Sequence, residues 1–234
     1  MNSRKKNARI AGLWYLLMAV TGGFGIMYAP MGIMVSGDAA ATAQKLIESE
    51  WIYRLSIVSN LVGQVCFIFL VFALNRLLED VNPKQAKLMV TLVIIAVPIA
   101  FINTLNLVAA QLFVSRVDFL NVFEVDKLNA LSMVFLKLYE HGILIVQIFW
   151  GLWLLPFGFL IIKSQFIPRV IGILLIVGCF AYLLASFIGL LWPAYNQIAS
   201  SILMLPISIG EFSIVFWLLI TGVKTTNGEL ASTV

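Results

Sequence analysis

The sequence predicts an all-α integral membrane protein, a polytopic helical bundle of about six transmembrane helices with short interfacial helices. Three observations predict this class. Of the 234 residues, 62% are apolar and 11% are charged, and the mean hydropathy is +1.03. The apolar residues fall into six long runs, and a spanning helix needs about 20 such residues. Within each run they cover all sides of a helix rather than one stripe, as in helices surrounded by lipid.

The six runs predict one membrane domain over residues 1–234. Its spans are expected at residues 10–34, 51–77, 88–114, 131–162, 170–192 and 200–223. The first run follows basic residues, as in a secretory signal, but it exceeds the usual signal core of about 7 to 15 residues, so a retained span is predicted. Pro98, Pro156 and Pro206 lie inside the third, fourth and sixth runs, where each removes a backbone hydrogen bond and favours a kink.

Two connections between the runs predict short helices at the membrane surface. The stretch 37–50 begins with Asp38, a residue type that favours helix starts, ahead of an alanine-rich segment. Arg54 follows Glu50 by four residues, a spacing that suits an ion pair within one helix, and Asp38 and Glu50 are both expected at the interface. The stretch 115–130 alternates charged and apolar residues, which is typical of a helix that lies on the surface.

The basic residues predict the orientation in the membrane, because short cytoplasmic loops are enriched in Lys and Arg. With six spans, one side carries ten of them: Arg4, Lys5, Lys6, Arg9, Arg76, Lys84, Lys87, Lys163, Arg169 and Lys224. The other side carries five: Lys45, Arg54, Arg116, Lys127 and Lys137. Both termini are therefore expected in the cytoplasm.

Composition and motifs argue against several functional classes. The net charge is +4, but the basic residues stand at the ends of apolar runs rather than in a patch, so no nucleic-acid partner is expected. Cys66 and Cys179 lie inside apolar runs and predict neither a disulfide nor a metal site. His141 is the only histidine, and HExxH, GxSxG and glycine-rich phosphate motifs are missing. We predict no metal, no cofactor and no catalytic residue.

Ionisable side chains inside the predicted spans are the main functional candidates, because such groups are costly in a membrane and usually face the interior of a bundle. At a rise of about 1.5 Å per residue, Glu140 in the fourth span and Glu211 in the sixth lie at matching depths, slightly outside the midplane. His141, about 100° further round its helix than Glu140, is expected to face a neighbouring helix.

Other polar side chains fall at a similar depth. They are Asn60, Gln64, Asn103, Asn106, Lys137 and Gln147, with Arg54 near the outer mouth. One hypothesis is that they line an outward-opening pocket for a small ligand, with Arg54 or Lys137 balancing a carboxylate. The rival is a structural or partner-binding subunit, in which the amides join helices and the basic side chains reach the headgroups. A third alternative, an intramembrane enzyme, lacks a recognisable nucleophile and base. The expected partners are the lipid bilayer and an unidentified small molecule or protein.

Four segments resemble a known family. They are ARIAGLWYLL (residues 8–17), SGDAAATAQKLIESEWIYRLSIV (36–58), FIPRVIGILLIVGCFAYL (166–183) and LPISIGEFSIVFWLLITGV (205–223). Their sequences are similar to those of the bacterial membrane family called domain of unknown function 4386. The resemblance covers essentially the whole chain. The resemblance implies a multi-pass protein of the bacterial cytoplasmic membrane. It carries over no catalytic or binding residue, and it draws attention to Asp38, Glu50, Arg54 and Glu211.

Overall fold

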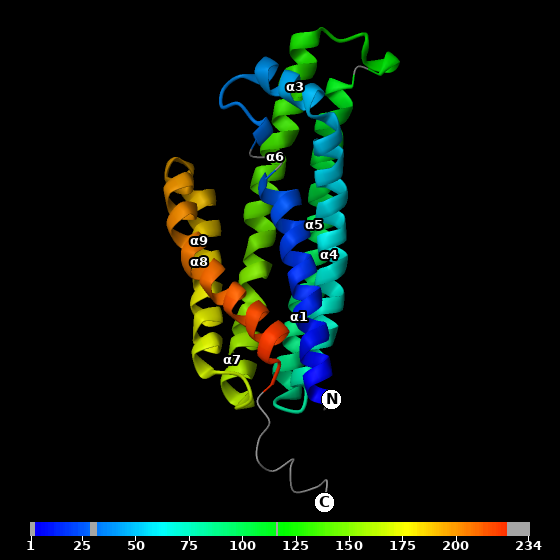
Figure 1. Cartoon of the computed structure of the whole chain (residues 1–234). Coiled ribbons are helices and arrows are strands. Elements are labelled where there is room, and N and C mark those ends of the chain that lie inside the picture. The colour runs from blue at the N-terminus through cyan, green and yellow to red at the C-terminus, as the bar shows by residue number, and fades with distance from the viewer. Residues whose placement is uncertain (1–2, 29–31, 116, 224–234) are drawn as a thin grey trace, which may run out of the picture. The chain divides into compact units, whose positions relative to one another are not determined.

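The computed structural model describes residues 3–28, 32–115 and 117–223, and these residues are helical almost throughout (Figure 1). The α-helices are α1 (Ser3–Gly22), α3 (Ala39–Glu48), α4 (Glu50–Leu78), α5 (Pro83–Val114), α6 (Val125–Leu152), α7 (Leu154–Ser164), α8 (Arg169–Leu191) and α9 (Asn196–Phe216). The short helices are the π-helices η1 (Gly23–Tyr28) and η4 (Trp217–Thr221) and the 3₁₀ helices η2 (Asp118–Leu120) and η3 (Pro193–Tyr195). The described residues include no strand, so the predicted all-α class is confirmed.

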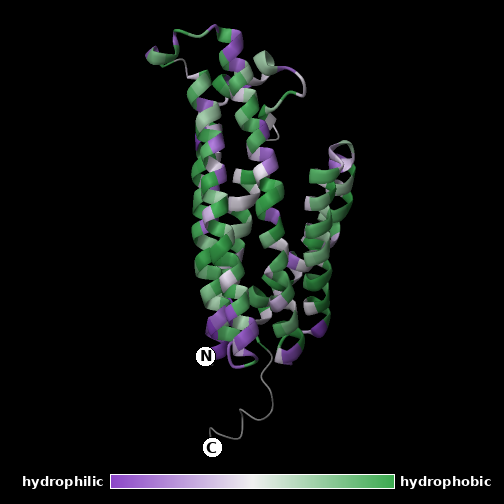
Figure 2. Cartoon of the chain, turned by 180° about the vertical axis from the view of Figure 1, so that it is seen from behind, coloured by the Kyte–Doolittle hydropathy of each residue, from purple (hydrophilic) through white to green (hydrophobic). Residues whose placement is uncertain are grey.

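Six stretches of the described chain are long and apolar enough to cross a membrane. They are Arg4–Ile26, Glu50–Leu78, Pro83–Val114, Val125–Ser164, Arg169–Leu191 and Pro193–Thr221. Each matches one of the six predicted runs. Figure 2 shows hydrophobic residues along these helices, with hydrophilic residues gathered mainly at helix ends and connections. Arg116 and Lys224, which enter the orientation argument, lie outside the described residues.

The connection before the second long helix forms the expected short helix. Asp38 caps α3, because its Oδ1 accepts a hydrogen bond of 2.8 Å from the backbone N–H of Ala41. The helix buries Thr42 and Leu46 on one face and leaves polar residues on the other. The predicted short helix is thus confirmed, and its position at the membrane surface stays a prediction.

The surface helix expected in 115–130 is not present. The chain instead makes the single turn η2, which Leu120 anchors as a buried side chain, and α6 already begins at Val125. Asp126 lies in the first turn of α6, where a negative charge favours the helix N-terminus. The charged residues of this stretch therefore start a long helix rather than cover a separate short one.

The fourth long stretch is interrupted at Trp153, between α6 and α7. Pro156 explains the break, because proline has no N–H to donate to the carbonyl of Leu152. It occupies the first turn of α7, where a missing donor is tolerated. Pro98 and Pro206, by contrast, lie inside α5 and α9.

The chain groups into two compact units built from alternating segments. The first consists of Met1–Leu16, Cys66–Ala96 and Leu144–Val234, and the second of Leu17–Val65 and Val97–Ile143. Since the segments alternate along the chain, neither unit is a continuous stretch of sequence. The single membrane domain over 1–234 stays a prediction.

An aromatic cluster forms the core of the first unit. Trp153 is fully buried, with ring centroids 5.1 Å from Phe67, 5.2 Å from Phe157 and 6.0 Å from Tyr15. Nearby, α7 and α8 pack against each other where Gly158 and Gly172 meet. A Cβ on either glycine would lie 2.6 Å from the backbone oxygen of the other, so only glycine allows this approach.

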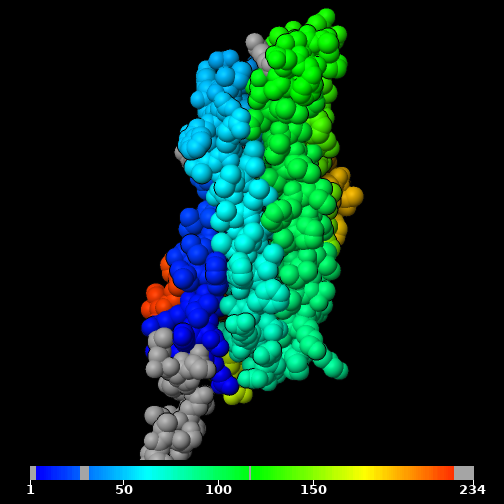
Figure 3. Space-filling model, turned by 90° about the vertical axis from the view of Figure 1, so that its right-hand side faces the viewer, coloured from blue at the N-terminus to red at the C-terminus, as the bar shows by residue number. Residues whose placement is uncertain are grey.

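The core of the second unit is formed by α3, α4, α5 and α6. Its buried side chains include Leu46, Tyr53, Leu107 and Tyr139. In this unit α4 and α5 lie side by side (Figure 3), and the hydroxyl of Tyr53 donates a hydrogen bond of 2.8 Å to the backbone oxygen of Leu107. Neighbouring helices are thus joined by polar links as well as by apolar packing.

The packing of η1 against α4 depends on one of two neighbouring glycines. A Cβ on Gly25 would lie 2.6 Å from the backbone nitrogen of Asn60 and 2.7 Å from the backbone oxygen of Ser56, whereas a Cβ on Gly23 would meet nothing within 4 Å. Gly25→Ala should therefore lower the free energy of unfolding by about 1 to 3 kcal/mol, because rigid backbone must move apart. Gly23→Ala, the matched control, should be neutral. Thermal unfolding of the two purified variants checks this, and equal stability would contradict the close approach.

Candidate functional site

A carboxylate in the first unit joins three helices. Glu211 lies on α9, and its Oε1 accepts a hydrogen bond of 2.7 Å from the hydroxyl of Tyr182 on α8. Its Oε2 accepts one of 3.0 Å from the hydroxyl of Tyr15 on α1. Each carboxylate oxygen thus has its own donor, and each donor comes from a different helix. We call Glu211, Tyr15 and Tyr182 the carboxylate triad.

Packing fixes the two tyrosines of the triad. Tyr15 is completely buried, and its ring lies against Trp153 in the aromatic core. Tyr182 lies opposite Gly151 on α6, where a Cβ would come within 2.7 Å of the Cβ of Tyr182. Burial thus fixes the Tyr15 ring, and close packing at Gly151 fixes the Cβ of the half-buried Tyr182, so that both hydroxyls meet Glu211.

The triad provides hydrogen bonds without positive charge. An ionised carboxyl group in apolar surroundings costs several kcal/mol unless charge or hydrogen bonds compensate it, and the tyrosine hydroxyls supply the latter. A carboxyl group held in this way can exist charged, with both hydroxyls donating, or protonated, with one of them turned to accept. Among the residues that the structure describes, no group of three His, Cys, Asp or Glu side chains could hold a metal ion.

Buried amides join three helices of the second unit. Asn60 on α4 donates from Nδ2 to the hydroxyl of Tyr139 on α6 at 2.9 Å. Asn103 on α5 donates from Nδ2 to the backbone oxygen of Tyr139 at 3.0 Å, and Asn106 donates to Oδ1 of Asn103 at 3.0 Å. Gly142, one turn after Tyr139, gives Asn103 its space, because any Cβ there would clash with the Asn103 side chain. Gln64 follows Asn60 one turn later on α4 and is also buried.

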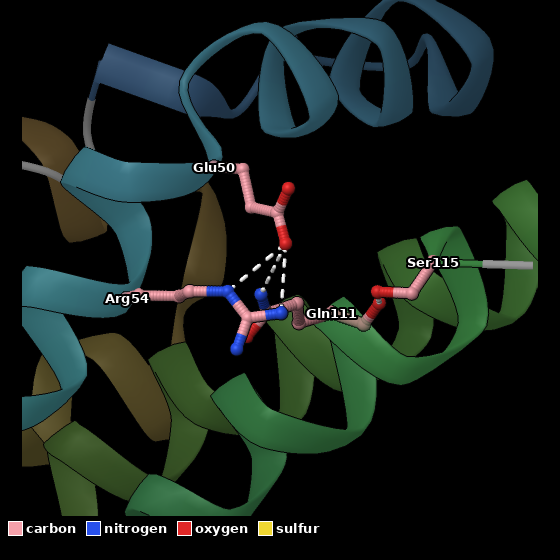
Figure 4. A network of polar contacts seen from close by, with 4 residues as sticks. All are labelled: Glu50, Arg54, Gln111 and Ser115. Atoms are coloured by element: carbon pink, nitrogen blue, oxygen red, sulfur yellow. Dashed lines mark hydrogen bonds and ion pairs between the residues drawn. The ribbon is translucent and has the colours of Figure 1, made fainter. Parts of the chain in front are cut away.

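The predicted pair of Glu50 and Arg54 is present at the start of α4 (Figure 4). Arg54 donates from Nη2 to Glu50 Oε1 at 2.7 Å and from Nε at 2.9 Å. The buried amide of Gln111 on α5 lies against both side chains: its nitrogen reaches Glu50 Oε1 at 3.3 Å, and in the opposite orientation its oxygen accepts from Arg54 at 2.8 and 3.0 Å. The pair itself is exposed and stabilises by less than about 1 kcal/mol. The pair and Gln111 hold the side chains at the start of α4 against α5.

Glu140 does not face the interior of its unit as expected. Its side chain is 48% exposed and accepts a hydrogen bond of 2.8 Å from Lys137, three residues earlier on α6. His141 is exposed as well, with Nδ1 2.8 Å from the backbone oxygen of Lys137, rather than against another helix. The reason is that Tyr139 and Gly142 face the core, and residues 140 and 141 then point to the other side of α6.

The candidate residues therefore fall into two groups. Asn60, Gln64, Asn103, Asn106, Arg54, Lys137 and Glu140 belong to the second unit, and Glu211 and the half-buried Gln147 belong to the first. Arg54 pairs with Glu50, as the spacing of four predicts, and Lys137 pairs with Glu140. One pocket lined by both groups stays a prediction.

Sequence reasoning missed the tyrosines. Tyr15 and Tyr182 at Glu211, and Tyr139 at Asn60 and Asn103, are the groups that pair with the predicted polar residues. One signal was available, because a carboxylate inside an apolar span needs donors and tyrosine combines an apolar ring with a hydroxyl. Tyr15, Tyr182 and Glu211 also lie in three of the four segments that resemble the known family.

A comparison with models of protein families identifies the family of this chain. Residues 10–222 match the model described as Domain of unknown function (DUF4386). The chain belongs to this family. The match includes the whole carboxylate triad and the buried amides, and the DUF4386 description assigns no activity. No curated protein and no solved structure matches the chain.

The triad predicts a measurable stabilisation by the two tyrosine hydroxyls. Tyr15→Phe and Tyr182→Phe should each lower the free energy of unfolding by about 1.5 to 3 kcal/mol, because each removes a hydrogen bond to a charged group. Tyr195→Phe is the control, since the Tyr195 side chain is 63% exposed. In a Glu211→Leu background the first two substitutions should have little effect, because their acceptor is gone. Thermal unfolding in detergent measures all of these, and unchanged losses in that background would contradict the triad.

Proposed function

We propose that this protein binds or transports a small ligand in the bacterial cytoplasmic membrane, and that Glu211 takes up and releases a proton in that process. The observation that carries the proposal is the carboxylate of Glu211, placed inside an apolar helix and held by hydroxyls from two other helices. Ionisable groups at such positions are costly and commonly mark proton or substrate pathways.

Protonation of Glu211 would change the links between α1, α8 and α9. In the charged form both tyrosine hydroxyls donate to the carboxylate, one to each oxygen. In the protonated form one oxygen of Glu211 carries a hydrogen, so either Tyr15 or Tyr182 has to turn and accept, or its bond is lost. A proton at this position thus shifts the relative stability of two arrangements of three helices.

The proposed orientation places both termini in the cytoplasm. Within the first unit, Nη2 of Arg4 lies 4.0 Å from Oδ2 of Asp80, in the turn between α4 and α5, and the Arg4 guanidinium stacks 5.5 Å from the ring centroid of Phe166, between α7 and α8. The start of α1 and these two connections therefore lie at one end of this unit. The start of α1 and the helix ends that flank these two connections carry nine of the ten basic residues that the positive-inside rule assigns to one side.

A structural or partner-binding subunit is the second candidate. It is favoured by the cross-helix hydrogen bonds of the second unit, where Asn60, Asn103 and Ser132 each bond to a neighbouring helix. Amides and hydroxyls often join membrane helices without any ligand. In this case Glu211 would serve only to hold α1, α8 and α9 together.

Topology provides the first test of the proposal. Reporter fusions placed before residue 3 and after Val223 should both report the cytoplasm, because the basic residues favour that side. Fusions in the connection between α3 and α4, and in that between α8 and α9, should report the opposite side. Termini on opposite sides of the membrane would refute the six-span arrangement.

Glu211→Gln separates the two candidates, since it keeps the shape of the side chain and removes the exchangeable proton. Difference infrared spectroscopy over a pH titration should show a protonated carboxyl band in the wild-type protein that is missing in Glu211→Gln. Glu140→Gln, which changes an exposed carboxylate paired with Lys137, is the matched control and should keep the band. If Glu211→Gln retains every titrating carboxyl band and is at least as stable as wild type, the structural role is the correct one.

A further inference from the structure

Two buried amide oxygens on α4 have no hydrogen-bond donor among the residues that the structure describes. They are Oδ1 of Asn60 and Oε1 of Gln64, whose side chains are 2% and 4% exposed. The two residues are four apart, so they lie one turn apart on the same face of the helix. A buried polar atom without a partner is destabilising, and here two such oxygens lie on one face of α4.

Both side-chain atoms without a partner at this site are hydrogen-bond acceptors. Asn60 Nδ2 already donates to Tyr139, and Asn103 Nδ2 to the Tyr139 backbone. The hydroxyl of Ser59 donates to the backbone oxygen of Thr21 at 2.9 Å, and that of Ser56 to the backbone oxygen of Tyr53 at 2.7 Å. A ligand that satisfies the two amide oxygens must therefore bring hydrogen-bond donors or positive charge.

The orientation of the Asn60 amide decides which of its two polar atoms is free. In the structure Nδ2 donates to the Tyr139 hydroxyl, so the free atom is Oδ1. In this orientation Gln64 Oε1 has no donor either.

Close packing limits the size of the ligand. At Gly25 the backbone of η1 is so close to α4 that a Cβ would come within 2.6 Å of the backbone nitrogen of Asn60. At Gly63, between Asn60 and Gln64, a Cβ would lie 3.0 Å from Oγ1 of Thr21. This side of α4 therefore leaves no space for an organic molecule, and the proposed ligand has to be small.

The backbone next to the site is irregular. At the junction of α1 and the π-helix η1, the chain changes from i→i+4 to i→i+5 hydrogen bonds, and the Thr21 carbonyl accepts a bond from Ser59 on α4. Such π-helical turns occur often at functional sites, and carbonyls at irregular backbone are common cation ligands in membrane proteins. The Thr21 carbonyl is thus in contact with Ser59, the residue before Asn60 on α4.

We propose that Asn60 and Gln64 are ligands of a monovalent cation, Na⁺, bound between α4 and η1 in the second unit. A water molecule would also satisfy the two oxygens with its hydrogens, but it would not make stability depend on the cation in solution. A cation needs only acceptors. The amide, hydroxyl and carbonyl oxygens here are neutral, and without a carboxylate they suit a monovalent rather than a divalent ion. This inference is independent of Glu211, which lies in the other unit.

The test compares the purified full-length protein in NaCl, KCl and N-methyl-D-glucamine chloride at equal ionic strength. Na⁺ should raise the thermal unfolding midpoint in a saturable way, because a ligand that binds only the folded state stabilises it. Equilibrium binding of radiolabelled sodium should saturate over the same concentration range. K⁺ should have a smaller effect, and N-methyl-D-glucamine none.

Substitutions assign the effect to the site. Gln64→Leu should abolish the Na⁺ effect and leave stability in N-methyl-D-glucamine unchanged or higher, because it removes an oxygen that lacks a donor. Gln147→Leu makes the same change in the other unit and should keep the Na⁺ effect. Asn60→Asp adds a negative charge at the site and should lower the half-saturating Na⁺ concentration about tenfold.

Two results would overturn the proposal. The first is equal stability of the wild-type protein in all three salts without sodium binding, which is what a buried water alone predicts. The second is a Na⁺ effect that Gln64→Leu and Asn60→Asp both leave unchanged, which would place the ion elsewhere. Glu211→Gln should retain the Na⁺ effect in full, so failure of the proton hypothesis and failure of the cation site give different results.

Discussion

The requirement that buried polar groups find partners away from water determines the internal arrangement of this protein. An apolar bilayer core offers no hydrogen bonds, so each polar side chain in a long helix has to meet another part of the protein. The carboxylate triad satisfies the most costly of these groups by bringing two hydroxyls to Glu211. The amides of the second unit follow the same rule, with the Tyr139 side chain and backbone serving Asn60 and Asn103. At the free oxygens of Asn60 and Gln64 the rule is not satisfied within the described chain, and the proposed cation would supply the missing partner.

Close contacts at glycine make these polar links possible. Gly142 leaves the volume that the Asn103 amide occupies, and Gly151 lies directly against Tyr182. A side chain at either position would push a neighbouring helix away and lengthen the hydrogen bond next to it. In a membrane, where helices gain little from apolar burial against each other, small residues and cross-helix hydrogen bonds together specify which faces meet.

The features that sequence could predict are local or compositional. The six long helices follow from the apolar runs, and α3 follows from Asp38 ahead of an alanine-rich segment. The pair of Glu50 and Arg54 follows from a spacing of four residues. The expectation that Glu140 faces the interior is wrong, because the contacts of Tyr139 with Asn60 and of Gly142 with Asn103 fix the rotation of α6. The partners of Glu211 are 196 and 29 residues away along the chain, a separation that no periodic pattern reports. The depth of a charged residue can be estimated from one helix, but its direction depends on packing.

The π-helical turn at Gly23–Tyr28 has a consequence for comparing this chain with others of its family. A π-turn holds one residue more than the α-turn it replaces, so it is what a single inserted residue produces in an otherwise regular helix. A relative that lacks one residue in this segment would continue as a regular α-helix through these positions. Alignment gaps of one position in the first span should therefore be read as the gain or loss of this turn.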